Sequence, residues 1–300
     1  MEITPHSFSP LNFLTSPPAR QSGRSGKGRA GWWGALLLVL VSGGGLAAET
    51  PLETGWAQIE RFQFNDALKT FQLADPQVNP RERTFGEAIA LLNVQPRSEA
   101  NALKAADLLQ QITKEKSDDA IGALSLYYLG RIYHLHLNTP DPDKARQKYR
   151  ETLQLHSGNP LAEMAAVSLI HLDAYGKKEP ADSIKALLAL EPLLDDLKSD
   201  IARREFHQAM GFAYLDFGDP QDAENQRRAI AHLKEADRIG ITRWQAEANL
   251  WVAIGEASRA VGDRETALEY YRKFVNTYKR DRRNYFIGEL IKKLEKEGQP

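Results

Sequence analysis

The stretch NLWVAIGEASRAVGDRETALEYYRKFVNTYKR, residues 249–280, decides the fold class of this 300-residue chain. It sets Gly255 between large apolar residues and then places Ala267 and Tyr271 one helical turn apart. Related phrases surround Gly130 and Gly211. Repetition of one helix-pair pattern predicts an α-solenoid, in which stacked pairs form the core and present an extended surface to a partner.

The chain from Leu52 onward is rich in good helix formers, namely Ala, Leu, Glu, Lys, Arg and Gln, and lacks alternating β-branched runs. Prolines recur at short intervals. We expect them at helix boundaries, because a proline inside a helix removes a hydrogen bond and clashes with the preceding turn. These prolines are Pro76, Pro80, Pro96, Pro140, Pro142, Pro160, Pro180, Pro192 and Pro220.

The segment from Asn249 to Arg280 resembles the tetratricopeptide repeat, a helix-turn-helix unit of about 34 residues. With the glycine at the eighth position of the repeat, four further positions match without an insertion: Trp251, Ile254, Ala267 and Tyr271. Two positions depart from the pattern, because Ser258 stands where tyrosine is usual and Phe274 where alanine is usual. In such repeats the glycine and alanine let two helices approach closely, so we expect the large aromatic residues to pack between helices.

Five further units follow the same pattern less closely. Those around Leu126 and His207 need insertions, at about 138–140 and 219–225. Three weaker pairs are expected at Gly55 with Phe71, at Gly86 with Leu109, and at 164–174 with 181–190. The segment Asn284–Glu297 is expected to form a helix with one apolar face, which would cover the end of the repeat array as a capping helix. The predicted fold is all-α, a right-handed α-solenoid of about six tetratricopeptide-like helix pairs with a C-terminal capping helix, over residues 49–300.

Composition limits the classes of function. The net charge is −1, and residues 1–30 carry four cations against one carboxylate, which leaves the remainder mildly acidic. General affinity for nucleic acid is therefore not expected, because it needs clustered positive charge. The chain has no cysteine, which excludes disulfides, thiolate metal sites, a cysteine nucleophile and an N-terminal lipid-bearing cysteine.

The N-terminal region has the features of an export signal. Residues 1–30 are basic, rich in Ser, Pro and Gly, and expected to be disordered. Residues 31–48 combine an apolar run with a small-residue exit, which predicts a signal peptide cleaved after Ala47 or Ala48. An uncleaved membrane anchor and a buried hydrophobic helix are the alternatives. The basic flank predicts an exported protein, periplasmic or membrane-associated, of the bacterial envelope type.

No catalytic motif was found. HExxH, GxSxG and glycine-rich phosphate loops are all missing, and the seven histidines form no ligand spacing. The pairs Asp141/Asp143 and Asp195/Asp196 are interpreted as a helix N-cap and a solvated helix face. We therefore expect no enzyme activity, no cofactor and no metal.

The resemblance implies that the first helix of each pair lines a concave face. The candidate groove residues on three such helices are Tyr127, Arg131 and His134; Glu205, Gln208, Phe212 and Asp216; and Asn249, Glu256 and Arg259. This mixed polar and aromatic set suits a peptide or protein segment. It lacks the Lys/Asn pairing of repeats that clamp a C-terminal carboxylate. The run 278–283 (YKRDRR) is either a helix end favoured by the helix dipole or an anionic docking site.

Three functional hypotheses remain from the sequence. The first is a non-catalytic scaffold of the cell envelope that binds a protein or peptide partner, loosely similar to envelope repeat proteins. The second is an inner-membrane-anchored protein that recruits a partner through its repeats, with membrane association through residues 31–48. The third, a repeat-containing cell-wall enzyme, would need catalytic carboxylates outside the repeats. Nothing indicates the partner or the oligomeric state.

Overall fold

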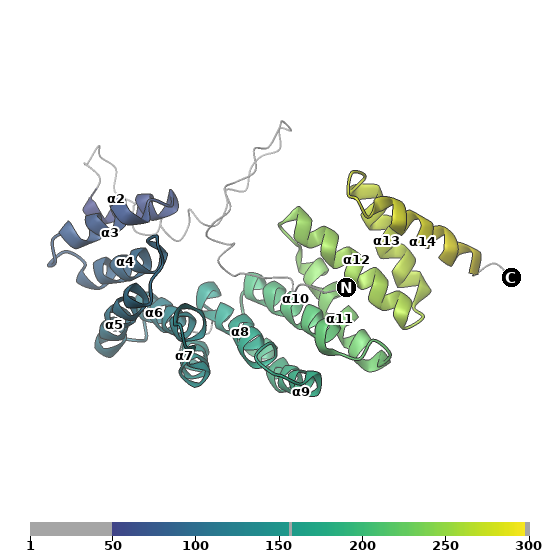
Figure 1. Ribbon diagram of the computed structural model, residues 1–300, viewed down its shortest axis with the longest axis horizontal. Helices are drawn as coiled ribbons and strands as arrows, with labels where there is room; N and C mark the ends of the chain where they lie inside the picture. Colours follow the sequence, from purple (N-terminus) through teal and green to yellow (C-terminus); the bar gives the residue numbers. More distant parts are fainter. Residues whose placement is uncertain (1–49, 156–157, 298–300) are drawn as a thin grey trace. The chain divides into compact units, whose positions relative to one another are not determined.

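The computed structural model describes residues 50–155 and 158–297, which divide into two compact units at Arg97 and Ser98 (Figure 1). The predictions for residues 1–30 and 31–48 lie outside the described residues. In the part that is described, every helix is too short or too polar to cross a membrane. A single repeat domain over residues 49–300 remains a prediction.

The first unit contains three described helices, α2 (Pro51–Glu60), α3 (Phe64–Leu73) and α4 (Pro80–Asn93). Helix α3 contacts both of the others. Its Phe71 is fully buried and faces a glycine on each side, Gly55 of α2 and Gly86 of α4. The Trp56 ring meets Phe71 edge-on, with 5.3 Å between ring centroids. One phenylalanine therefore holds the three helices together.

The second unit is a succession of helices, each packed on its neighbours in the chain (Figure 1). The helices are α5 (Glu99–Glu115), α6 (Ala120–Arg131), α7 (Pro142–Leu155), α8 (Pro160–Asp173), α9 (Pro180–Leu190), α10 (Asp200–Phe217), α11 (Ala223–Ile239), α12 (Trp244–Ala260), α13 (Arg264–Thr277) and α14 (Asn284–Glu297). A π-helical turn, η2 (Ile132–His136), extends α6, and a 3-10 turn, η3 (Glu191–Asp196), follows α9.

Local sequence explains where these helices begin. Side chains of Thr50, Ser98, Asp119 and Ser199 accept hydrogen bonds from the first-turn backbone N–H groups of α2, α5, α6 and α10. Prolines open α2, α4, α7, α8 and α9, where their missing N–H is not needed. The expectation that prolines mark helix boundaries is therefore confirmed for the described helices.

The all-α fold of sequential helix pairs is confirmed. The pairs α6/α7, α10/α11 and α12/α13 pack closely through the glycines that the sequence pattern singled out. A Cβ on Gly130 or Gly255 would lie 2.6 or 2.4 Å from the ring of Tyr149 or Tyr271. The pair α8/α9 and the capping helix α14 also lie where they were expected, and α14 buries Ile287, Ile291 and Leu294. Tyr149, Tyr214, Tyr271 and Trp251 are buried packing residues, as expected.

One pairing differs from expectation. The helices α4 and α5 were expected to form a pair, but the division between the two units falls in the loop that joins them. Within the first unit α4 packs on α2 and α3, and within the second α5 packs on α6. Close-packing residues such as Gly86 and Leu109 identify buried helix faces, and they do not identify the helix that covers each face.

We expect the substitution Gly255→Ala to destabilise the second unit by about 1–3 kcal/mol, because the added methyl would overlap the fully buried Tyr271 ring. Gly288 in α14 provides a matched control, since a Cβ there meets no atom within 4 Å. Gly288→Ala should stabilise the protein by up to about 1 kcal/mol through helix propensity. Urea unfolding of both variants measures the difference, and equal effects would contradict this account of the packing.

Candidate interaction surface

The predicted groove residues of α6 gather around a buried guanidinium. Arg131 is only 4% exposed, and its side chain makes no ion pair or hydrogen bond with any described residue. Its Cζ lies 5.5 Å from the ring centroid of Tyr128 and 6.0 Å from that of Tyr127. Stacking on aromatic rings is a favourable use of arginine, but it provides no counter-charge. Arg131 therefore carries a positive charge that remains unbalanced in this part of the protein.

The π-helical turn η2 continues from Arg131 and carries His134. Single π-turns interrupt α-helices rarely, and often at functional sites. The His134 ring meets Tyr149 edge-on, and its Nδ1 lies 3.5 Å from the Tyr149 hydroxyl. Burial lowers the pKa of His134 to about 4, helped by the neighbouring His171 and Arg131. His134 is therefore neutral at physiological pH. The Asp173 carboxylate, whose charge also acts on His134, is already engaged in an ion pair with Arg146 at 2.7 Å.

The candidate residues of α10 are mostly engaged with their own chain. Glu205 is buried in an ion pair with Arg204, at 2.8 Å. Asp216 accepts a hydrogen bond of 2.7 Å from the Tyr175 hydroxyl. Gln208 is buried, and Phe212 is half-buried against the C-terminal apolar cluster. These contacts give the α10 residues a structural role in the pairs α8/α9 and α10/α11.

The candidate residues of α12 are more exposed. Asn249 accepts a hydrogen bond of 2.8 Å from Arg283, and Glu256 pairs with Arg259 at 2.7 Å. Within the described residues no hydrogen bond or ion pair joins them to the candidate residues of α6 or α10, so each set stays with its own helices. That these ten residues form one partner-binding surface remains a prediction. Sequence reasoning missed Tyr128, although its spacing of three from Arg131 places the two on one helix face.

Two histidines face each other between α10 and α11. The Nδ1 atoms of His207 and His232 lie 3.0 Å apart, and the His232 ring stacks on Tyr214. Glu191 of η3 faces His232 at 3.7 Å and accepts a hydrogen bond from Tyr214, while Arg228 pairs with Glu191. Burial, followed by the repulsion of His232, lowers the pKa of His207 to about 4, and burial also lowers the pKa of His232.

We expect acid to destabilise the second unit through this pair. A histidine whose folded pKa lies below its usual 6.5 binds fewer protons folded than unfolded, so its contribution is complete above pH 6.5 and lost towards pH 4. The variant His207→Gln/His232→Gln should therefore show a smaller fall in urea midpoint over that range than the unmodified protein. Identical pH profiles would contradict this role. His134 and His171 remain in the variant, and burial lowers the pKa of both, so part of the acid sensitivity should persist.

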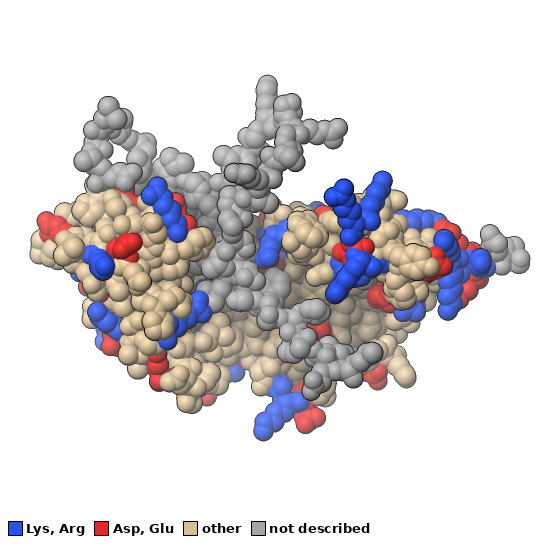
Figure 2. Space-filling view, turned by 45° about the horizontal axis from the view of Figure 1, so that its top comes forward, with Lys and Arg blue, Asp and Glu red and all other residues tan. Residues whose placement is uncertain are grey.

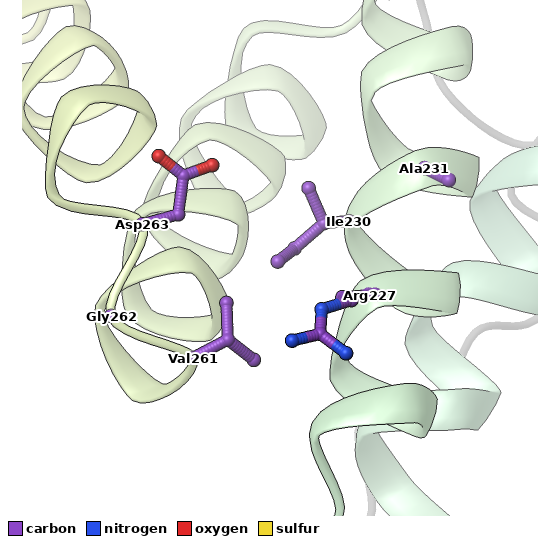
Figure 3. A pocket seen from close by; sticks show the side chains of 6 residues that line it. All are labelled: Arg227, Ile230, Ala231, Val261, Gly262 and Asp263. Atoms are coloured by element: carbon purple, nitrogen blue, oxygen red, sulfur yellow. The ribbon is translucent and has the colours of Figure 1, made fainter.

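A hollow of about 450 Å³ lies between α11 and the turn that joins α12 to α13 (Figure 3). The side chains of Arg227 and Ile230 extend into it from α11, and Val261, Gly262 and Asp263 line the opposite side (Figure 3). The Asp263 carboxylate already caps α13 by accepting from the Thr266 N–H, and hydrogen bonds from the Thr266 side chain and backbone lower the pKa of Asp263. The carboxylate at this hollow therefore has a structural role in the start of α13.

The acidic pairs found in the sequence have structural positions. Asp141 caps α7 by accepting from the Lys144 N–H at 3.0 Å, as expected. Asp195 and Asp196 lie exposed on the 3-10 turn η3, not on an α-helix. Within the described residues there is no cluster of three or more histidine and acidic side chains able to hold a metal. The expectations of no cofactor and no catalysis remain predictions.

Comparison with known proteins gives one distant structural similarity. No family model matches it, and no curated protein matches it. Among solved structures it is similar to a chain of the APC/C hetero-tetramer Cut9–Hcn1, with 14% identity and a TM-score of 0.45. The match covers 81% of this chain and 42% of that chain, so this chain spans less than half of the other. The chain is a helical repeat protein on the evidence of its own packed helix pairs.

Proposed function

We propose that this protein is a non-catalytic scaffold that binds an acidic segment of a protein partner on its first-helix surface, in the manner of a tetratricopeptide array. The observation that carries the proposal is Arg131. A buried charge without a counter-ion is costly, so a protein rarely retains one unless a ligand completes it. A partner carboxylate would form a two-pronged pair with the guanidinium, between the rings of Tyr127 and Tyr128.

The proposed location is the bacterial envelope, with the repeats exported. Its support is the sequence of residues 1–48, in which a basic segment (1–30) is followed by an apolar run and a small-residue exit (31–48). The alternative is a protein that keeps these residues as a membrane anchor and recruits its partner at the membrane surface. Intact mass and N-terminal sequence of the protein from its native cells separate the two. A mature chain that begins at Ala48 or Glu49 supports export with cleavage, and a chain that retains residues 31–41 supports the anchor.

The binding proposal is tested with a random peptide library displayed on phage and selected on the full chain. We expect the selected peptides to be enriched in Asp and Glu. Synthetic versions of the selected peptides are then titrated, by fluorescence anisotropy, with two variants of the protein, Arg131→Met and Arg259→Met. The second is the control, because Arg259 is an exposed residue of α12 that is already paired with Glu256. Loss of a buried charge pair should weaken binding at least about tenfold in the first variant only.

A structural role for Arg131 predicts a different outcome. If its charge served only the fold, Arg131→Met would lower the thermal midpoint and leave the peptide preference unchanged. Under the proposal the substitution is neutral or stabilising in the free protein, because it removes an uncompensated buried charge. Selected peptides without acidic residues, or equal affinities for the two variants, would overturn the proposal.

A further inference from the structure

The second unit carries a surface where exposed cations and exposed aromatic rings meet, which we name the basic-aromatic face. It consists of Trp244, Lys279, Arg280, Arg282, Tyr285 and Phe286. These residues come from the start of α12, the connection between α13 and α14, and the first turn of α14. Figure 2 shows Lys and Arg side chains projecting from the molecular surface, with acidic side chains among them.

Internal contacts hold the face in place. The Tyr278 ring lies 6.2 Å from Trp244 and 5.6 Å from Trp251, and its hydroxyl bonds to Glu247. Arg283 donates to Asn249 of α12 at 2.8 Å and lies 5.1 Å from the Phe274 ring centroid. The connection between α13 and α14 is therefore fixed against α12, which brings Trp244 to residues more than thirty positions later in the sequence.

The cations of the face are not neutralised by the described residues. Asp281, the one carboxylate in the connection, forms an ion pair with Arg283 at 2.8 Å. Lys279, Arg280 and Arg282 are exposed and make no ion pair with any described residue. They are also not needed to cap α13, because the Asn284 side-chain amide already donates to the carbonyls of Val275 and Tyr278. The structure therefore argues against these cations being a simple helix end.

The aromatic rings indicate the chemistry of the partner. Trp244, Tyr285 and Phe286 are 59%, 78% and 60% exposed, although folded proteins more often bury rings of this size. Exposed tryptophan and tyrosine beside lysine and arginine are typical of protein surfaces that lie at the headgroup level of a bilayer. An acidic peptide would use the cations, but it would leave rings that project from separate helix ends mostly in water.

We infer that the basic-aromatic face binds the surface of a membrane containing anionic phospholipid, with its three rings among the headgroups. Each cation near such a surface contributes about 1 kcal/mol, which corresponds to roughly a fivefold change in affinity. Reversing the three cations should therefore weaken binding by more than about a hundredfold. This contact is independent of residues 31–48 and of the groove proposed above.

The absence of cysteine allows a site-specific test on the full chain. The variant Phe286→Cys is labelled with the environment-sensitive dye NBD and mixed with phosphatidylcholine vesicles that contain about 30% phosphatidylserine. We expect a blue shift and a severalfold rise in emission, neither of which occurs with phosphatidylcholine alone. A label at Leu188→Cys, an exposed position on α9, should not respond, so attachment through residues 31–48 alone is distinguishable.

Matched charge reversals complete the test. The response at position 286 should be abolished by reversing the three cations of the face, in the variant Lys279→Glu/Arg280→Glu/Arg282→Glu. It should be preserved when three exposed lysines elsewhere are reversed, in the variant Lys177→Glu/Lys178→Glu/Lys185→Glu. Circular dichroism confirms that both variants are folded. An unchanged response after the first reversal, or no response to anionic vesicles, would overturn the inference. A response to soluble polyglutamate without one to vesicles would also overturn it and would indicate an acidic protein partner.

Discussion

Phe71→Ala is expected to unfold the first unit, at a cost of about 3–5 kcal/mol. Phe71 is fully buried and fills the space above two glycines on two different helices, so no neighbouring side chain can replace it. The described core of this unit is three short helices, and such a small core has little stability to spare. Hydrogen exchange followed by mass spectrometry should show that residues 51–93 lose protection.

Leu73→Ala is the matched control for this prediction. Leu73 lies two residues further along the same helix and is 86% exposed, so its truncation should change stability by less than about 0.5 kcal/mol. The second unit should keep its protection in both variants. Retained protection of residues 51–93 in Phe71→Ala would show that the ring is not the centre of this core.

Glu163→Ala is expected to destabilise the second unit by about 3 kcal/mol or more. The Glu163 carboxylate is buried at the start of α8 and accepts hydrogen bonds from the N–H groups of Gly158, Lys198 and Ser199, at 2.6, 3.0 and 2.9 Å. Alanine would leave these donors without their acceptor, and each hydrogen bond to a charged group contributes about 1.5–3 kcal/mol. The carboxylate thus joins the start of α8 to the segment that leads into α10.

Urea unfolding checks this prediction against two further variants. Glu163→Gln keeps one acceptor oxygen and should lose less stability than alanine does. Glu289→Ala removes an exposed carboxylate paired with Lys292 on α14 and should cost less than about 1 kcal/mol. If Glu163→Ala were no less stable than Glu289→Ala, the buried hydrogen bonds would not have the importance given to them here.

Much of the fold could be predicted from close-packing residues. A helix pair that packs tightly needs a small residue opposite a ring, and this requirement is visible as a local sequence pattern. It identifies Gly255 with Tyr271 and Gly130 with Tyr149. The capping helix Asn284–Glu297 was also predictable, since its one apolar face is a local property. The π-turn after Arg131 and the division at Arg97 were not, because they depend on which neighbour a helix face meets.

The candidate sites were less predictable for the same reason. The sequence placed Arg131 on a first helix, but only the structure shows that no described carboxylate reaches it. The run 278–283 was visible as positive charge and could equally have been a helix end. In the structure the Asn284 side chain donates to the last carbonyls of α13 and Trp244 lies beside Tyr278, and these contacts favour a binding surface over a simple helix end. Contacts between positions that are distant in the chain cannot be recognised from a single sequence.

The succession of neighbouring contacts in the second unit has a consequence for regulation. Helix α6 contacts α5, α7 and α8, and helix α12 contacts α11 and α13. A change of shape at one of them would have to pass through every intervening interface before it reached the other, and each interface can absorb part of it. We therefore expect almost no coupling free energy between a ligand at Arg131 and one at the basic-aromatic face. The two would bind additively, and the protein would act as a tether that links two partners without either one switching the other.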